Sequence, residues 1–157
     1  MTNLMIFLPD DTATSRLGAI LAGLLRPGDT VLLNGPIGAG KTHLARSFIQ
    51  NFIGRMEDVP SPSFTLVQVY GADGTEIWHA DLYRLSHPDE VIELGLVDAF
   101  DTAICLIEWP DKLGKMAPKN ALTITLSAEG EGRFAELAGS AHSLLLKKIS
   151  TLWGENV

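Results

Sequence analysis

The chain has 157 residues, of which 46% are hydrophobic and 20% are charged. This composition is typical of a folded domain and excludes a disordered or fibrous chain, and the length predicts a single domain over residues 1–157. The net charge of −7 is opposite in sign to that of a protein that grips nucleic acid on its own.

The acidic residues are concentrated in one part of the chain. Ten acidic residues and one basic residue lie between positions 73 and 111. We interpret the surplus as a source of solubility, with metal binding or the docking of a basic partner as alternatives. The single cysteine excludes an internal disulfide and a CxxC zinc site. No apolar run approaches the roughly 18 residues of a membrane helix, and the first residues lack the basic start of a signal peptide. We therefore expect a cytoplasmic protein without membrane association.

The first third of the chain alternates between strand and helix patterns. Residues 4–8 form a short apolar run that predicts a strand, and the acidic turn at 9–12 is typical of a helix start. Apolar residues then recur at helical spacing, which predicts a helix that ends before Pro27. They are Leu17, Ile20, Leu21, Leu24 and Leu25. Residues 30–33 predict a buried strand, and residues 42–52 predict the next helix.

The rest of the chain is richer in strands. Residues 64–70 and 75–82 flank a glycine turn, which favours an antiparallel hairpin. Residues 88–96 indicate a short acidic helix, and the continuous apolar run at 103–109 is typical of the middle of a parallel sheet. Two further strands at 122–126 and 133–138, and an amphipathic helix at 140–153, complete the pattern.

The strongest motif is a glycine-rich loop between the strand at 30–33 and the helix at 42–52. Its sequence Gly35-Pro36-Ile37-Gly38-Ala39-Gly40-Lys41-Thr42 fits GxxxxGK[ST], the Walker A motif. The glycines let backbone N–H groups point into one concavity that suits phosphates. Lys41 is expected to reach the β- and γ-phosphates, and the hydroxyl of Thr42 to ligate Mg²⁺. The motif predicts binding of a nucleoside triphosphate. The fold class we expect is α/β: a P-loop NTPase with a mainly parallel central sheet flanked by helices and an added antiparallel hairpin.

A P-loop protein also requires an acidic residue at the end of a neighbouring strand. Glu108 follows the buried run 104–107, whereas Asp81 ends an alternating segment in the expected hairpin. We therefore assign Glu108 to the Mg²⁺ side of the site. We assign Asp81 to a position near the γ-phosphate.

Three neighbours of these acids allow more than one interpretation. We favour a structural or edge-strand position for His79 over a role as a base. Trp109 is either a packing residue or a contact for a nucleotide or partner. Arg84 either neutralises Asp81, which we favour slightly, or faces the phosphates as an arginine finger from the same chain.

With these motifs together, the sequence resembles the TsaE (YjeE) family of bacterial proteins along nearly its whole length. The matching segments beside the phosphate loop are residues 9–12, SPSF at 61–64, HADLYR at 79–84, ELG at 93–95, IEWP at 107–110 and Gly132-Arg133. The resemblance implies a small ATPase that uses ATP and Mg²⁺ and is needed to form N6-threonylcarbamoyladenosine at position 37 of tRNAs that read codons starting with A. It implies slow hydrolysis by the chain alone, and a role other than that of the transferase.

The resemblance also implies partners and residue roles. Family members bind a heterodimer of TsaD and TsaB, so tRNA is expected to be contacted only through that complex. Lys41, Asp81 and Glu108 carry over as catalytic residues, and Thr42 and Glu108 as the Mg²⁺ ligands. The nucleotide-binding set is Asp11, Gly38, Ala39, Gly40, Lys41, Thr42, His43 and Arg133, with Asp11 and Arg133 on the adenine side. The loop at 61–64 resembles a switch near the γ-phosphate.

Two other functions remain as alternatives. A small-molecule kinase has a similar size and the same loop, but it usually carries a lid rich in arginine. The six arginines of this chain are scattered along the sequence. A module that binds a nucleotide without hydrolysing it is the other alternative.

Overall fold

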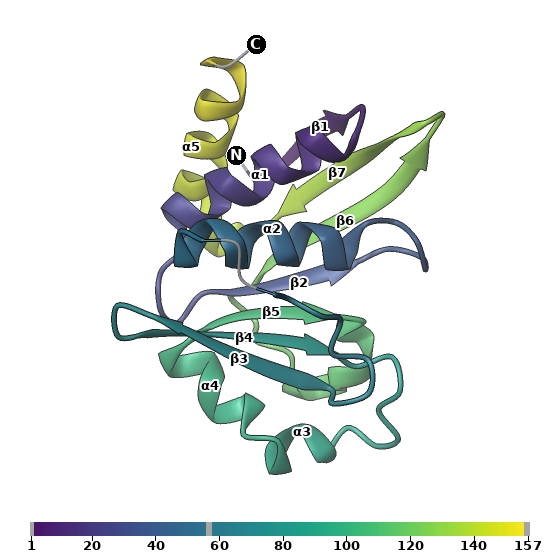
Figure 1. Cartoon of the computed structure of the whole chain (residues 1–157), viewed down its shortest axis with the longest axis vertical. Coiled ribbons are helices and arrows are strands. Elements are labelled where there is room, and N and C mark those ends of the chain that lie inside the picture. Colours follow the sequence, from purple (N-terminus) through teal and green to yellow (C-terminus); the bar gives the residue numbers. More distant parts are fainter. Residues whose placement is uncertain (1, 56–57, 156–157) are drawn as a thin grey trace.

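The computed structural model of the chain describes residues 2–55 and 58–155, and within these it has one sheet of seven strands (Figure 1). The strands are β1 (Asn3–Leu8), β2 (Thr30–Asn34), β3 (Val67–Ala72), β4 (Thr75–Asp81), β5 (Ile104–Glu108), β6 (Leu122–Glu129) and β7 (Gly132–Ala138). Their order in the sheet is β1-β7-β6-β2-β5-β4-β3. The four middle strands are parallel, and the pairs at both edges are antiparallel. The expected α/β class with a mainly parallel centre is confirmed.

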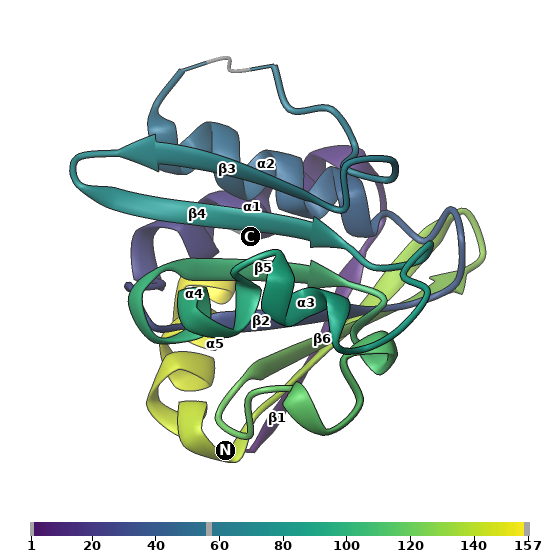
Figure 2. The same ribbon diagram turned by 90° about the horizontal axis from the view of Figure 1, so that it is seen from below.

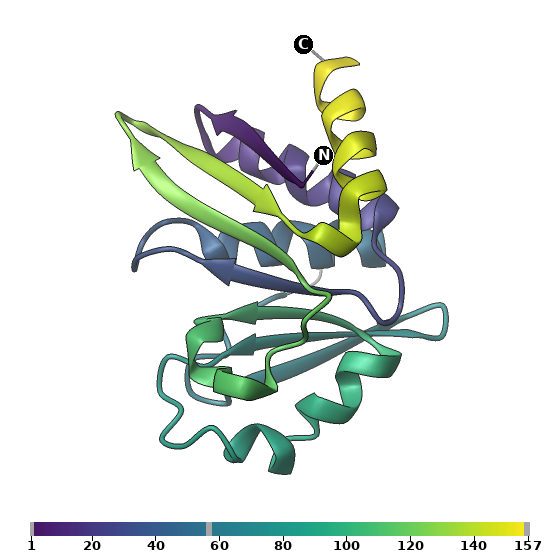
Figure 3. The same ribbon diagram turned by 180° about the vertical axis from the view of Figure 1, so that it is seen from behind.

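Helices cover both faces of this sheet. The helices are α1 (Asp11–Leu24), α2 (Lys41–Ile53), α3 (Glu90–Glu93), α4 (Leu96–Thr102) and α5 (Ser143–Glu155), with the short 3₁₀ helices η1 (Pro110–Met116) and η2 (Ser140–His142). Figure 3 shows α1, α2 and α5 on one side of the sheet and α3 and α4 on the other. Among the described residues, no helix is both long and apolar enough to span a bilayer.

Each face of the sheet has its own buried core. Leu17, Leu33 and Ile49 belong to the cluster under α1 and α2, and Leu82 and Leu96 belong to the cluster beside α4. Each of these side chains is almost fully buried, and burial of one such side chain stabilises the fold by about 1.5–3 kcal/mol. Strand β5 contributes to both clusters, and all five of its residues are buried. Its continuous apolar sequence is explained by this central position.

The N-terminal ends of α1 and α2 are capped in different ways. The side chain of Asp10 caps α1 by accepting a hydrogen bond of 3.0 Å from the N–H of Ala13. Helix α2 instead starts after Gly40, which has no side chain to cap it. The first N–H groups of α2 are therefore free to bind another acceptor.

One expectation from the sequence is corrected. The acidic segment at 88–96 is not one helix, because Gly95 adopts φ +83° and separates α3 from α4. The expected antiparallel hairpin of β3 and β4 is confirmed, and it lies at one end of the sheet. Its second strand pairs with β5 in parallel, so β4 lies inside the sheet and only β3 forms the edge.

Candidate functional site

The predicted site residues gather at the carboxyl edge of the parallel strands. Figure 2 shows β4 and β5 pointing toward the same side of the molecule as the loop that follows β2. Asp81 ends β4, Glu108 ends β5, and the two are neighbours in the register of this strand pair. Such an edge is where α/β sheets bind ligands.

A hollow of about 410 Å³ opens at this edge, which we call the phosphate pocket. It is lined by Ile37, Gly38, Ala39, Gly40, Lys41, Thr42, His43, Ser61, Ser63, Asp81, Tyr83, Arg84, Glu108 and Trp109. The residues that the sequence assigned to the phosphates and to Mg²⁺ therefore share one cavity.

Close packing explains two of the glycines in the loop. Gly35 has φ +146°, and a Cβ there would lie 2.7 Å from the carbonyl oxygen of Leu126. Gly40 has φ +99°, and its Cβ would lie 3.3 Å from the guanidinium of Arg133. A side chain at position 35 would collide with the backbone of β6, whereas at position 40 the left-handed φ is the stronger reason for glycine, since the Arg133 side chain can shift.

Lys41 is held at the floor of the phosphate pocket. Its ammonium donates a hydrogen bond to the carbonyl of Gly35 and lies 3.5 Å from the centroid of the Trp109 ring. Only 5% of Lys41 is exposed. Burial lowers the pKa of Lys41, and the nearby Glu108, Asp81 and Asp111 carboxylates oppose that shift. A cation in this position is ready to meet phosphate oxygens.

Trp109 contacts this lysine because of an unusual backbone. Its φ of +58° lies in the left-handed region, which a bulky residue rarely adopts. The ring also packs against Tyr83, with 5.0 Å between the ring centroids. The sequence left Trp109 open between packing and contact, and the structure places it against the phosphate-loop lysine.

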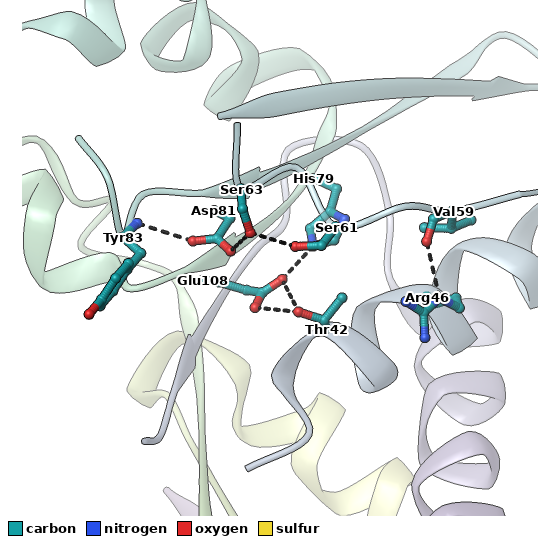
Figure 4. Close-up of polar contacts among 9 residues, drawn as sticks. All are labelled: Thr42, Arg46, Val59, Ser61, Ser63, His79, Asp81, Tyr83 and Glu108. Atoms are coloured by element: carbon teal, nitrogen blue, oxygen red, sulfur yellow. Dashed lines mark hydrogen bonds and ion pairs between the residues drawn. The ribbon is translucent and has the colours of Figure 1, made fainter. Parts of the chain in front are cut away.

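Thr42, Glu108 and His79 form one connected group between α2, β5 and β4 (Figure 4). The hydroxyl of Thr42 donates to the Glu108 carboxylate, at 2.8 Å from Oε1 and 3.0 Å from Oε2. Nε2 of His79 lies 2.7 Å from Oε2 of the same carboxylate. The edge-strand position considered for His79 is wrong, since β4 is interior and His79 is fully buried. Sequence reasoning missed its contact with Glu108, although alternation along β4 does place His79 on the same face as Asp81.

Asp81 lies beside the 61–64 loop, which resembles a switch near the γ-phosphate. Ser63 donates a hydrogen bond of 3.2 Å to Oδ2 of Asp81, and the hydroxyl oxygens of Ser61 and Ser63 are 2.8 Å apart (Figure 4). The backbone N–H of Tyr83 donates to Oδ1 at 3.1 Å. The carboxylate is thereby fixed at the pocket wall, in contact with the 61–64 loop.

Asp11, His43 and Arg133 meet next to the phosphate loop. Arg133 forms an ion pair of 3.2 Å with Asp11 and donates to the carbonyl of Gly38 at 3.4 Å. Nε2 of His43 lies 3.2 Å from the carbonyl oxygen of Asp11. Arg133 also lines a second hollow, of about 240 Å³, on the other side of the loop. These three residues come from α1, α2 and β7, and the fold brings them together beside the phosphate loop.

Arg84 is at the pocket but not where the sequence favoured it. Its guanidinium carbon lies 4.5 Å from the centroid of the Phe64 ring, and 84% of Phe64 is exposed. Among the ion pairs of residues 2–55 and 58–155, none joins Arg84 to Asp81. The favoured neutralising role is therefore not the arrangement that the structure has.

The donor chemistry of the site fits Mg²⁺. Thr42 and Glu108 supply a hydroxyl and a carboxylate, which are oxygen ligands of the kind that Mg²⁺ prefers. Across the described part of the chain, no three His, Cys, Asp or Glu residues form a group that would hold a metal by themselves. Two protein ligands are enough for Mg²⁺, which usually keeps waters and binds substrate phosphates as well.

Comparison with protein families and curated sequences finds relatives of this chain. The sequence model described as "Threonylcarbamoyl adenosine biosynthesis protein TsaE" matches residues 8–135. The chain is 38% identical over 143 residues to the tRNA threonylcarbamoyladenosine biosynthesis protein TsaE of Haemophilus influenzae, covering 87% of this chain and 90% of that protein. It is 37% identical over 129 residues to the protein of that name from Rickettsia felis, covering 82% and 75%. The Bacillus subtilis protein is 32% identical over 141 residues, covering 87% of each.

A solved structure agrees with these relatives. The crystal structure of YdiB from Bacillus subtilis superimposes with a TM-score of 0.79 at 27% sequence identity. The match covers 96% of this chain and 97% of that one. The likeness therefore extends over nearly the whole chain and is not limited to the phosphate loop.

Proposed function

The chain belongs to the TsaE family of threonylcarbamoyl adenosine biosynthesis proteins, and from this premise we propose that it is an Mg²⁺-dependent ATPase. It serves the formation of N6-threonylcarbamoyladenosine at position 37 of tRNAs that read codons starting with A, and it is not the transferase. The observation that carries the proposal is the convergence of Lys41, Thr42, Asp81 and Glu108 on one pocket behind a phosphate loop. Its sequence likeness to TsaE proteins connects this chemistry with tRNA modification.

The pocket acts mainly by positioning and charge neutralisation. The glycine loop and the uncapped start of α2 offer N–H groups to phosphate oxygens. Lys41 turns from the Gly35 carbonyl to the β- and γ-phosphates. Thr42 and Glu108 would hold Mg²⁺, which would supply positive charge to the phosphates. The Glu108 carboxylate already accepts a hydrogen bond from Thr42. Asp81 is therefore the carboxylate that remains to orient the attacking water.

Phosphate release by the purified protein tests the ATPase directly. We expect slow release by the chain alone and faster release with TsaD and TsaB, because a switch requires a long-lived bound state. Lys41→Ala and Glu108→Ala should each lower the rate by about 10²–10³-fold, since the first removes a positive charge that meets the phosphates and the second removes a ligand of Mg²⁺. Release no greater than that of the two variants, even with both partners present, would exclude hydrolysis. Free phosphate as the product, with no phosphorylated acceptor, distinguishes an ATPase from a small-molecule kinase.

The partners in this proposal are TsaD and TsaB, and the acidic segment offers a surface for docking them. Asp89, Glu93 and Asp98 are exposed on α3, α4 and the residue before α3. Glu90 is less available, because its carboxylate accepts hydrogen bonds from the N–H groups of Ser86 and His87. The three exposed acids are therefore the stronger candidates for meeting a basic surface.

Charge reversal tests this docking surface. Changing Glu93 and Asp98 to lysine together should weaken association with the TsaD–TsaB complex and reduce its dependence on salt, because two attractive charges become repulsive. Binding is measured by calorimetry at low and moderate ionic strength. Reversal of Glu129 and Glu131, at the β6–β7 turn, is the control. An unchanged affinity would leave the acids as a solvated face.

A further inference from the structure

The least exposed polar side chain near the phosphate pocket is His79. It lies on β4 with no exposed surface, and its Nε2 is 2.7 Å from Oε2 of Glu108 (Figure 4). Glu108 itself has 3% of its side chain exposed. Burying a polar pair at this depth is costly unless both groups are hydrogen-bonded. Core packing alone is served better by an apolar residue, as at Ile77 two positions earlier on the same face.

The hydrogen bond restricts how the Glu108 carboxylate can turn. The last torsion of a glutamate side chain is broad, so its two oxygens exchange places easily when nothing holds them. Here His79 holds Oε2, while the Thr42 hydroxyl is closest to Oε1, at 2.8 Å. Because the Thr42 hydroxyl also reaches Oε2, at 3.0 Å, the two partners together fix the plane of the carboxylate.

The surroundings of the ring also indicate which nitrogen carries the proton. Nδ1 of His79 is buried and has no hydrogen-bond partner among residues 2–55 and 58–155. A proton on Nδ1 would be a buried donor without an acceptor, which costs more than an unused acceptor next to apolar side chains. The arrangement favours a proton on Nε2, which donates to Glu108.

We propose that His79 is a positioning residue that sets the orientation of Glu108 toward Thr42 and so raises the affinity of the nucleotide site for Mg²⁺. The proposal rests on the proposed function, since it concerns the same site. His79 does not itself line the phosphate pocket, whereas its hydrogen-bond partner Glu108 does, so His79 acts through Glu108. Partners that fix a metal ligand in this way typically change metal affinity or activity by roughly 10- to 100-fold.

Two amides of different length separate a positioning role from a packing role. In His79→Gln the amide nitrogen reaches about as far as Nε2 and can still donate to Glu108. In His79→Asn the same group is one methylene shorter and cannot. The measurement is binding of a fluorescent, non-hydrolysable ATP analogue as Mg²⁺ is added, together with binding in EDTA. We expect the half-saturating Mg²⁺ concentration to rise roughly 10-fold or more in His79→Asn and to stay within about threefold of wild type in His79→Gln. Binding in EDTA should be unchanged in both.

A buried control accounts for loss of stability. Ile77→Ala removes apolar volume from the same face of β4 and should lower the melting temperature without moving the Mg²⁺ midpoint. All variants are compared below their melting temperatures, and His79→Leu replaces His79→Asn if the latter does not fold. Equal midpoints for His79→Asn and wild type, or equal shifts in Asn and Gln, would overturn the role of His79. If wild-type protein binds the ATP analogue equally well with and without Mg²⁺, the proposed function is overturned, and the role of His79 with it.

Discussion

Two hollows of nearly equal volume differ in the residues that line them and in the elements that form them. The phosphate pocket measures about 410 Å³, and a groove between α1 and α5 measures about 400 Å³. The first gathers a lysine, two carboxylates and several hydroxyls. The second is lined by Leu24, Leu144, Lys147, Lys148, Thr151 and Leu152. Size therefore does not identify the site in this fold, and the convergence of polar groups does.

The difference arises from the elements that form each hollow. The pocket lies where parallel strands end, so residues distant in sequence meet at one edge with their backbones fixed by the sheet. The groove lies between two helices, and its lining side chains project from surfaces that serve mainly to pack. Substitutions in the pocket should therefore have large effects on hydrolysis, and substitutions in the groove should have small ones.

Beyond the Lys41 and Glu108 variants, the largest effect is expected at Asp81. Asp81→Asn keeps the shape but removes the charge that orients water, so the hydrolysis rate should fall about 100-fold or more. Affinity for the nucleotide should change little, since Lys41 and the loop are intact. Single-turnover phosphate release and analogue binding measure the two effects separately. Asp98→Asn, an exposed acid outside the pocket, should leave both unchanged. A normal rate in Asp81→Asn would assign the water to another residue.

A smaller effect is expected at Arg133, behind the phosphate loop. Arg133→Gln removes the ion pair with Asp11 and the bond to the Gly38 carbonyl. Such partly exposed contacts are weak, so we expect nucleotide affinity to fall by about two- to fivefold. Calorimetric titration with an ATP analogue measures this change. A loss of affinity well above fivefold would mean that Arg133 binds the nucleotide directly.

The burial of Lys41 predicts a dependence of stability on pH. Its pKa is lowered from 10.5 in the folded chain, so above the lowered value the folded state releases the proton while the unfolded state keeps it. Stability of the wild type relative to Lys41→Met should therefore rise as the pH increases through that window toward 10.5, and should be level below it. Urea unfolding of both proteins at several pH values measures the difference. A difference that falls with pH would contradict the burial of the charge.

The smallest effect is expected in the groove. Leu144 is 66% exposed, so Leu144→Ser should change the free energy of unfolding by no more than about 0.5 kcal/mol. Phosphate release should be unaffected, because no residue of the phosphate pocket lies in the groove. Denaturant unfolding and the phosphate assay check both. A clear loss of hydrolysis would show that the two hollows are coupled.

The sequence predicted most of what is periodic or carried by a local motif. The apolar run of β5 and the Walker A loop were both placed correctly, because their signals lie within a few consecutive residues. The contact of His79 with Glu108 was not predictable, since it depends on β4 lying beside β5 and on their register. The break between α3 and α4 depends on the backbone of Gly95, and the place of Trp109 over Lys41 depends on a left-handed φ. Neither conformation is encoded by periodicity.

The reactivity of the single cysteine can report when the sheet opens locally around it. Cys105 is fully buried in β5, three residues before Glu108, and burial raises the pKa of its thiol to about 12. A thiol reagent can therefore modify it only when β5 separates from its neighbours. A nucleotide that binds only the closed sheet should slow this labelling in proportion to its saturation. Occupancy of the phosphate pocket becomes measurable as a labelling rate, with no change to the sequence.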